Sequence, residues 1–125
     1  MKHEIETRYA PKAIGPYSQA IQSRNGMLFA SGQIPINPET GNIESADIAE
    51  QTHRVLKNIG AVLKAAERDY TDVVKTTVFL TDLNDFATVN EIYGEYFRQP
   101  YPARSCVQVA ALPKNAKIEM EIIAE

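Results

Sequence analysis

Arg104 and Cys106 are the residues whose types and spacing first suggest chemistry in this sequence. They lie two positions apart in residues 103–109, a segment whose composition predicts a β-strand, so both side chains would point to one face of a sheet. A guanidinium group binds a carboxylate through two parallel hydrogen bonds. A single arginine is more often a surface ion pair of little energetic value, so the pattern alone leaves both interpretations open.

Residues 117–124 predict a second strand with one apolar and one charged face. Glu119 lies on the charged face, which Ile123 interrupts with an apolar side chain. The other face is continuously apolar, as expected of a strand packed on a core. It consists of Ile118, Met120, Ile122 and Ala124.

Alternation also gives an expectation for which way the arginine points. If the apolar side chains Val107 and Val109 face the core, then Arg104, Cys106 and Glu119 share the opposite face of the sheet. That face would be a wet surface in the simplest interpretation. Because cysteine is usually buried, we expect instead that another copy of the chain covers it.

Cys106 has a second possible role, as a covalent nucleophile. No histidine lies close to it in the sequence to activate the thiol, which favours a cysteine that only lines a site. His3 and His53 have no metal-ligand spacing, so we expect them at the surface and expect no metal site.

Two apolar patterns of helical period predict helices. The first begins at Asp47, with Glu50 three residues later as in a capping box, and continues to Ala66. The second begins at one of the polar residues at 82–85 and ends before Pro100. Its apolar face contains Phe86, Val89, Tyr93 and Phe97.

The remaining segments predict strands and loops. Asn25-Gly26 favours a tight turn between two strands, and residues 34–42 are rich in loop formers. The order of elements favours one α+β domain, residues 1–125, with both helices packed on one face of a mixed sheet. The expected strands are residues 17–23, 27–32, 73–80, 103–109 and 117–124.

The composition excludes several classes of partner. The net charge of -3 gives no basic surface for nucleic acid, and no segment has the ~20 apolar residues of a membrane span. The N-terminal residues lack the apolar core of a signal peptide, and the one cysteine forms no internal disulfide. We therefore expect a cytoplasmic protein that binds neither nucleic acid nor membranes.

Seven ordered segments between residues 13 and 121 resemble the RidA/YjgF family of 2-iminobutanoate/2-iminopropanoate deaminases. Each is short, and their order along nearly the whole chain makes the resemblance specific. The segments are A-I-G-P-Y-S-Q (13–19), S-G-Q-I-P (31–35), V-V-K-T-T-V-F (73–79), F-A-T-V-N (86–90), P-A-R-S-C-V (102–107), L-P-K (112–114) and I-E-M-E (118–121).

The resemblance implies a chorismate-mutase-like homotrimer with clefts between neighbouring subunits. It implies hydrolysis of imines and enamines, such as 2-aminoacrylate and 2-iminobutanoate, to 2-oxo acids and ammonia. Arg104 would bind the substrate carboxylate, Glu119 would hold a water and Tyr17 would close over the substrate. The other matching positions at the cleft are Ser31, Gly32, Asn90 and Cys106.

Two other functions and one departure remain open. The same arginine would serve a non-catalytic trimer that senses 2-oxo acids, and ribonuclease or chaperone-like roles are suggested for members of the family.

The family often has a glycine at the end of the first long helix, where this chain has Glu67. We expect a residue near Arg68 or Asp69 to take the left-handed conformation there instead.

Overall fold

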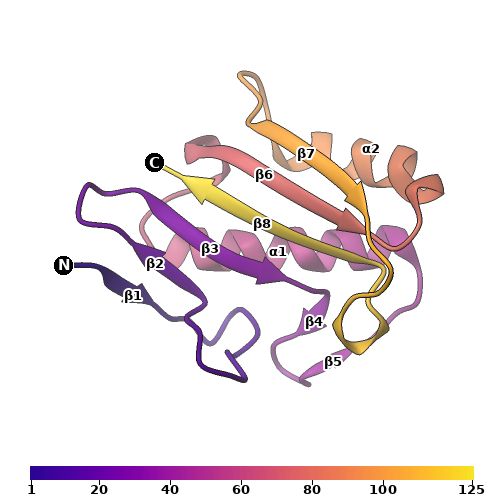
Figure 1. The fold of residues 1–125 in the computed structure, drawn as a ribbon, viewed down its shortest axis with the longest axis horizontal. Helices are drawn as coiled ribbons and strands as arrows, with labels where there is room; N and C mark the ends of the chain where they lie inside the picture. The colour runs from indigo at the N-terminus through magenta and orange to yellow at the C-terminus, as the bar shows by residue number, and fades with distance from the viewer.

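A six-stranded mixed sheet lies at the centre of the computed structural model, which describes residues 1–125 (Figure 1). The strand order is β1-β2-β3-β8-β6-β7, in which β6 and β7 are parallel and every other pair is antiparallel. The strands are β1 (His3–Ile5), β2 (Ala20–Gln22), β3 (Leu28–Gln33), β6 (Val73–Leu80), β7 (Ala103–Gln108) and β8 (Ile118–Ala124).

Both helices, α1 (Ile48–Ala65) and α2 (Phe86–Tyr96), cover the same face of this sheet (Figure 1). The expected α+β architecture is therefore confirmed. No helix is long and apolar enough to cross a membrane. The smaller elements are β4 (Ile36–Asn37), β5 (Asn42–Ile43) and the 3-10 turns η1 (Tyr70–Asp72), η2 (Leu83–Asp85) and η3 (Pro113–Asn115).

The core forms between the helices and the apolar face predicted for β8. Ile118, Met120, Ile122 and Ala124 are all at most 2% exposed, as the alternation predicts. Removing these side chains from water is the main favourable contribution to folding. They pack in one cluster with apolar residues of α1, among them Val55, Ile59, Val62 and Leu63.

The pairing of β7 corrects the predicted direction of Arg104. Arg104 pairs with Thr76 of β6, which is fully buried, so the Arg104 side chain lies on the helix-covered face. Phe79 of β6 pairs with both Val107 and Glu119, which places these two on the outer face. Cys106 likewise pairs with the buried Val78, and Arg104 and Cys106 therefore do not share a face with Glu119.

Tyr17 lies outside the strand that the sequence predicted for it. The strand β2 begins only at Ala20, and residues 11–19 form an irregular loop. The predicted turn at Asn25-Gly26 is confirmed, with Gly26 at φ 92° between β2 and β3. The first strand, β1, was not predicted, and the predicted loop at 34–42 contains β4 and the start of β5.

Asp47 caps α1 as predicted, but the capping box is incomplete. The Asp47 carboxylate accepts a hydrogen bond from the Glu50 backbone N–H at 3.0 Å. The Glu50 side chain contacts the Ser45 hydroxyl instead of returning to the Asp47 backbone. The Asp47 N–H donates to that same Ser45 hydroxyl at 3.0 Å, so Ser45 replaces the second half of the box.

Glu67 itself takes the left-handed conformation that ends α1, with φ 59°. The Arg68 N–H donates to the Leu63 carbonyl at 2.8 Å, and the Glu67 N–H to the Lys64 carbonyl at 3.0 Å. These two bonds form a Schellman motif. The expectation that a residue other than Glu67, near Arg68 or Asp69, would take this role was wrong, because the motif needs the residue directly after the C-cap Ala66.

The strain at Glu67 predicts that Glu67→Gly stabilises the protein. Glycine adopts a positive φ without the steric cost of about 1 kcal/mol that an L-residue incurs, so the free energy of unfolding should rise by about that amount. Urea denaturation measures the change. Lys64→Gly, on the exposed last turn of α1, should instead lower stability by about 1 kcal/mol. Equal or lower stability of Glu67→Gly would contradict the assigned role.

Candidate active site

Arg104 lies at the β7 edge of the sheet, where α2 provides the groups that contact its guanidinium. Its guanidinium donates a hydrogen bond from Nη1 to the Asn90 side-chain oxygen at 2.8 Å. The guanidinium carbon lies 4.8 Å from the ring centroid of Tyr93 and 5.2 Å from that of Phe86. Aromatic faces attract a cation without neutralising it. Neutral groups therefore orient Arg104, and its positive charge remains available to an anion.

The support for Arg104 continues into the core through Tyr93. The Tyr93 hydroxyl shares a 2.8 Å hydrogen bond with the Thr76 hydroxyl, and both residues are buried. Burial raises the pKa of Tyr93, while the Thr76 hydrogen bond and the Arg104 charge lower it by less. This ring is thus fixed in place and holds the guanidinium at the surface. The helical period predicted Tyr93 and Phe86 on the apolar helix face, but it gave no sign of their contact with Arg104.

Cys106 is half-buried beside Arg104 and remains a thiol. Burial raises the pKa of Cys106, and the nearby Arg104 charge only partly opposes that rise. A nucleophilic cysteine requires the opposite shift, because the thiolate is the reactive form. The geometry therefore favours a residue that lines the site over a covalent nucleophile.

Four other candidate residues line a separate cavity of about 850 Å³: Tyr17, Ser31, Gly32 and Glu119. Tyr17 comes from the 11–19 loop, Ser31 and Gly32 from β3, and Glu119 from β8. The Ser31 hydroxyl donates to the Ser18 carbonyl at 2.6 Å, which leaves the Ser31 oxygen as an acceptor. Tyr17 is 49% exposed at the rim of this cavity.

Glu119 packs directly against Gly32. A Cβ added at Gly32 would overlap the Glu119 carboxylate, so only glycine allows this approach. Burial, and secondly the charge of Glu121, raise the pKa of Glu119. A carboxylate with a raised pKa is a stronger base than an ordinary glutamate and can orient a water molecule.

The sheet separates these two groups within one chain. Arg104, Asn90 and Cys106 gather on the helix-covered side, whereas Glu119 points to the outer side, with Tyr17 at the same cavity. The structure therefore brings the predicted residues together as two half-sites and not as one site. A single chain cannot place Arg104 and Glu119 on the same small ligand.

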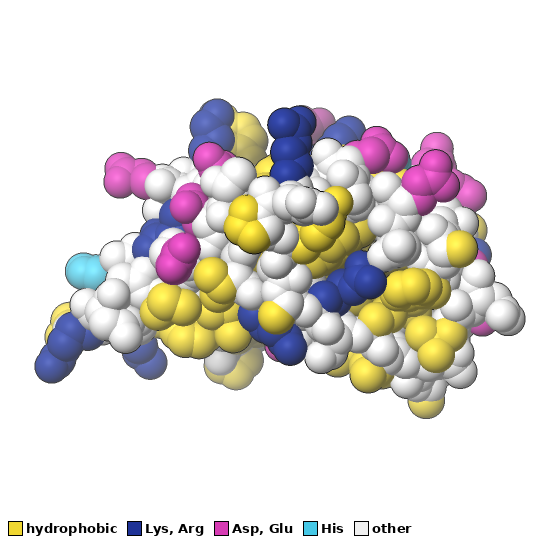
Figure 2. Space-filling view, turned by 90° about the horizontal axis from the view of Figure 1, so that it is seen from above, with side chains coloured by type: hydrophobic (Ala, Val, Ile, Leu, Met, Phe, Trp, Pro, Cys, Tyr) yellow, Lys and Arg dark blue, Asp and Glu magenta, His cyan; other side chains and the backbone are white.

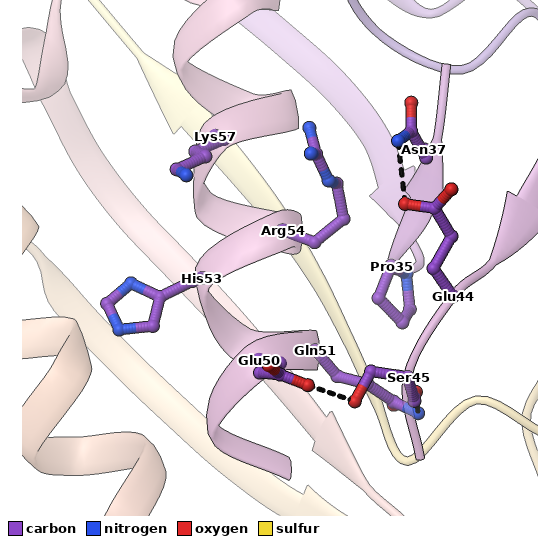
Figure 3. A pocket seen from close by; sticks show the side chains of 9 residues that line it. All are labelled: Pro35, Asn37, Glu44, Ser45, Glu50, Gln51, His53, Arg54 and Lys57. Atoms are coloured by element: carbon purple, nitrogen blue, oxygen red, sulfur yellow. Dashed lines mark hydrogen bonds between the residues drawn. The ribbon is translucent and has the colours of Figure 1, made fainter. Parts of the chain in front are cut away.

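A second hollow, beside α1 and β4, contains only polar and charged groups and Pro35 (Figure 3). His53 and Arg54 leave the helix in different directions, and Glu44 and Glu50 bond to neighbouring polar side chains (Figure 3). His53 is half-buried, with Nδ1 2.7 Å from the Tyr96 hydroxyl, and so is less exposed than expected. No three His, Cys, Asp or Glu side chains gather closely enough to hold a metal. The side chains of this hollow therefore do not point toward one common ligand position.

The environment of Glu119 predicts a pH-dependent gain in stability for Glu119→Gln. A raised pKa in the folded state means that ionisation of Glu119 destabilises the fold as pH rises through that value. The glutamine variant does not ionise, so it should unfold at higher urea concentration than the parent at neutral pH. The difference should vanish below about pH 4.3, the ordinary pKa of glutamate. Glu91→Gln, at an exposed site on α2, is the control, and a pH-independent difference for Glu119→Gln would contradict this.

The sequence matches known proteins along almost its whole length. It is 57% identical over 123 residues to the chloroplastic Reactive Intermediate Deaminase A of Arabidopsis thaliana, covering 98% of this chain and 65% of that protein. It is 52% identical over 124 residues to the human protein named 2-iminobutanoate/2-iminopropanoate deaminase, covering 99% of this chain and 90% of that protein. The chain thus spans about two thirds of the Arabidopsis protein and nearly all of the human one.

Solved structures share the fold at similar identity. A Rid-family protein of unknown function, YyfA from Yersinia pestis, superimposes with a TM-score of 0.96 at 56% identity, covering 99% of this chain and 98% of that one. TdcF of E. coli with bound serine superimposes with a TM-score of 0.91 at 51% identity, covering 98% and 97%. The family profile described as Endoribonuclease L-PSP matches residues 7–125. These matches confirm the resemblance inferred from the motifs: the chain belongs to the Endoribonuclease L-PSP family, which includes the RidA/YjgF proteins.

Proposed function

We propose that this chain hydrolyses 2-imino acids and their enamine tautomers to 2-oxo acids and ammonia. The substrates would be 2-iminopropanoate, formed from 2-aminoacrylate, and 2-iminobutanoate, and the products pyruvate and 2-oxobutanoate. The observation that carries the proposal is the guanidinium of Arg104, which neutral partners hold at the surface with its charge uncompensated. The relatives named as deaminases support the reaction type.

The protein needs only to orient the substrate and a water molecule, because the carbon of a protonated imine is already electrophilic. Arg104 would bind the carboxylate with two hydrogen bonds and fix the imine carbon in place. Glu119 would orient a water molecule and accept its proton as the C–O bond forms, and would return that proton to the departing amine. As the C–N bond of the resulting carbinolamine breaks, its hydroxyl gives its proton to Glu119, which passes it to the released ammonia, and the 2-oxo acid remains. The reaction needs no cofactor, because orientation alone supplies several kcal/mol.

The other candidate residues have supporting roles in this proposal. Asn90 orients Arg104, and Cys106 lines the wall beside it. Ser31 offers its free acceptor lone pairs, and the Gly32 backbone lies next to Glu119. Tyr17 would move over the bound substrate and exclude bulk water.

The complete site would form between two copies of the chain. Arg104 at the β7 edge of one copy would meet the cavity containing Glu119 on the outer face of the next copy. Such a contact joins two different surfaces and closes into a ring when repeated around an axis. The family resemblance implies three copies, a homotrimer. Two apolar side chains on the outer face support this arrangement. Phe29 and Val107 are 47% and 43% exposed there, and contact with another copy of the chain would bury them.

Two alternative functions predict no acceleration of imine hydrolysis, and separate measurements distinguish them from each other. A metabolite sensor would bind 2-oxo acids and fail to accelerate imine hydrolysis. A ribonuclease, as the family description suggests, would cleave RNA. Figure 2 looks onto the side formed by β7 and α2, where Lys and Arg are scattered among hydrophobic and acidic side chains. This distribution does not favour RNA binding.

Arg104→Ala should lower kcat/KM for 2-iminobutanoate by about 100-fold or more. Each hydrogen bond to a charged group contributes about 1.5–3 kcal/mol, and two are lost. The substrate is generated by a dehydratase, and release of the 2-oxo acid is followed. Cys106→Ser is the matched control and should keep substantial activity. If Arg104→Ala keeps the parent's rate, the carboxylate does not bind there.

Mixed trimers test whether each cleft takes residues from two copies. Arg104→Ala and Glu119→Ala chains are each expected to be inactive. After they are unfolded together and refolded in equal amounts, about a quarter of the clefts should combine an intact Arg104 with an intact Glu119. The mixture should therefore regain about a quarter of the parent's activity. The control is a mixture of Arg104→Ala chains with Asn90→Ala chains. Both substitutions lie in the same half-site, so no cleft in this mixture has both residues intact, and mixing should restore no activity. A mixture as inactive as its components would contradict the shared cleft.

A further inference from the structure

Gln19 is a buried polar residue that no step of the proposed reaction uses. It is only 3% exposed, and a buried amide is costly unless its hydrogen bonds are satisfied. Its Oε1 accepts from the Thr7 N–H at 2.7 Å. Its Nε2 lies 3.0 Å from the Thr7 carbonyl, 3.2 Å from the Ala10 carbonyl and 2.8 Å from the Pro11 carbonyl. One side chain thus binds the backbone at Thr7, Ala10 and Pro11, where the loop that carries Tyr17 begins.

The other end of this loop is fixed to β3. The Ser31 N–H donates to the Gln19 carbonyl at 2.9 Å, and the Ser31 hydroxyl donates to the Ser18 carbonyl at 2.6 Å. The two ends of residues 11–18 are therefore held side by side, as in an Ω-loop. Gln19 belongs to both ends, through its side chain at one and its backbone at the other.

The loop has little else to hold it in place. Within it, the Tyr17 N–H donates to the Gly15 carbonyl at 2.8 Å, and the Ile14 N–H reaches the Tyr17 hydroxyl only at 3.5 Å. Ile14 is 80% exposed and contributes little packing. The position of Tyr17 over the cavity therefore depends on how the ends of the loop are held.

We propose that Gln19 is a positioning residue that sets the loop bearing Tyr17 over the cavity formed by Ser31, Gly32 and Glu119. It acts through Tyr17 and touches no reacting atom. The expected effect of Gln19 on catalysis rests on the proposed deaminase function. Its expected effect on the loop rests only on the hydrogen bonds described above.

The chemistry of the amide explains why glutamine occupies this position. An amide both donates and accepts, and Gln19 uses both capacities. A glutamate of the same shape only accepts when ionised, so it would face the carbonyls of Thr7, Ala10 and Pro11 with no proton to offer. Methionine has similar length, carries no charge and removes every one of these bonds.

The first measurement is hydrogen exchange of two backbone amides that the closed loop protects: that of Tyr17, bonded to the Gly15 carbonyl, and that of Ser31, bonded to the Gln19 carbonyl. Gln19→Glu and Gln19→Met should both speed exchange there by about tenfold or more, because the loop opens more easily. Gln22→Glu is the matched control. It makes the same chemical change three residues further along, where the side chain meets Arg68, and should leave the loop unchanged. Unchanged exchange in both Gln19 variants overturns the inference, whether or not the parent hydrolyses imines.

The second measurement separates positioning from a general loss of structure. Gln19→Met should lower kcat/KM for 2-iminobutanoate by about tenfold. In a Tyr17→Ala background the same substitution should cost less than about twofold, because the residue through which it acts is gone. Losses that multiply in the double variant would overturn the inference. An inactive parent would instead contradict the deaminase function, and the exchange measurement would then decide the role of Gln19.

Discussion

The parallel pairing of β6 with β7 decides to which face of the sheet Arg104 and Cys106 point. It sets Arg104 beside the buried Thr76 and Val107 beside Phe79, so the arginine emerges over α2 and the valine faces outward. The antiparallel pairing of β6 with β8 sets Glu119 beside Phe79 as well. A sheet gives each side chain one face only, and changing the register by one residue would exchange the faces. The separation of Arg104 from Glu119 is thus a property of the backbone, and the proposed shared cleft follows from it.

The proposed binding of a carboxylate also requires that the guanidinium of Arg104 is held in one position without being neutralised. A carboxylate partner would orient Arg104 equally well, but it would compete with an acidic ligand for the same donors. The amide of Asn90 and the rings of Phe86 and Tyr93 avoid that competition. The Tyr93–Thr76 hydrogen bond carries this support down to the sheet. A short helix and an edge strand are sufficient to present a directed positive charge.

Local patterns predicted most elements, and the errors have identifiable physical causes. Asp47 and the strand Val73–Leu80 were predicted correctly because a cap and a buried β-branched run depend on nearby residues. The predicted face of β7 was wrong because the apolar Val107 points to the outer side. Alternation alone does not distinguish the face that helices cover from a face that another copy of the chain would cover. The role of Glu67 was missed because a Schellman motif depends on hydrogen bonds rather than residue type. The site residues came from motif resemblance, whereas Gln19 emerged only from its contacts.

The exposed Phe29 and Val107 on the outer face have a consequence for how catalytic capacity varies with the amount of protein. If every cleft exists only where two chains meet, an isolated subunit contributes no turnover at all. Output per chain then follows mass action: it collapses on dilution below the dissociation constant of the ring and saturates above it. Activity per chain would therefore rise steeply once the concentration of the protein exceeds that dissociation constant. A destabilised subunit would lower the activity of the clefts that it shares with intact neighbours.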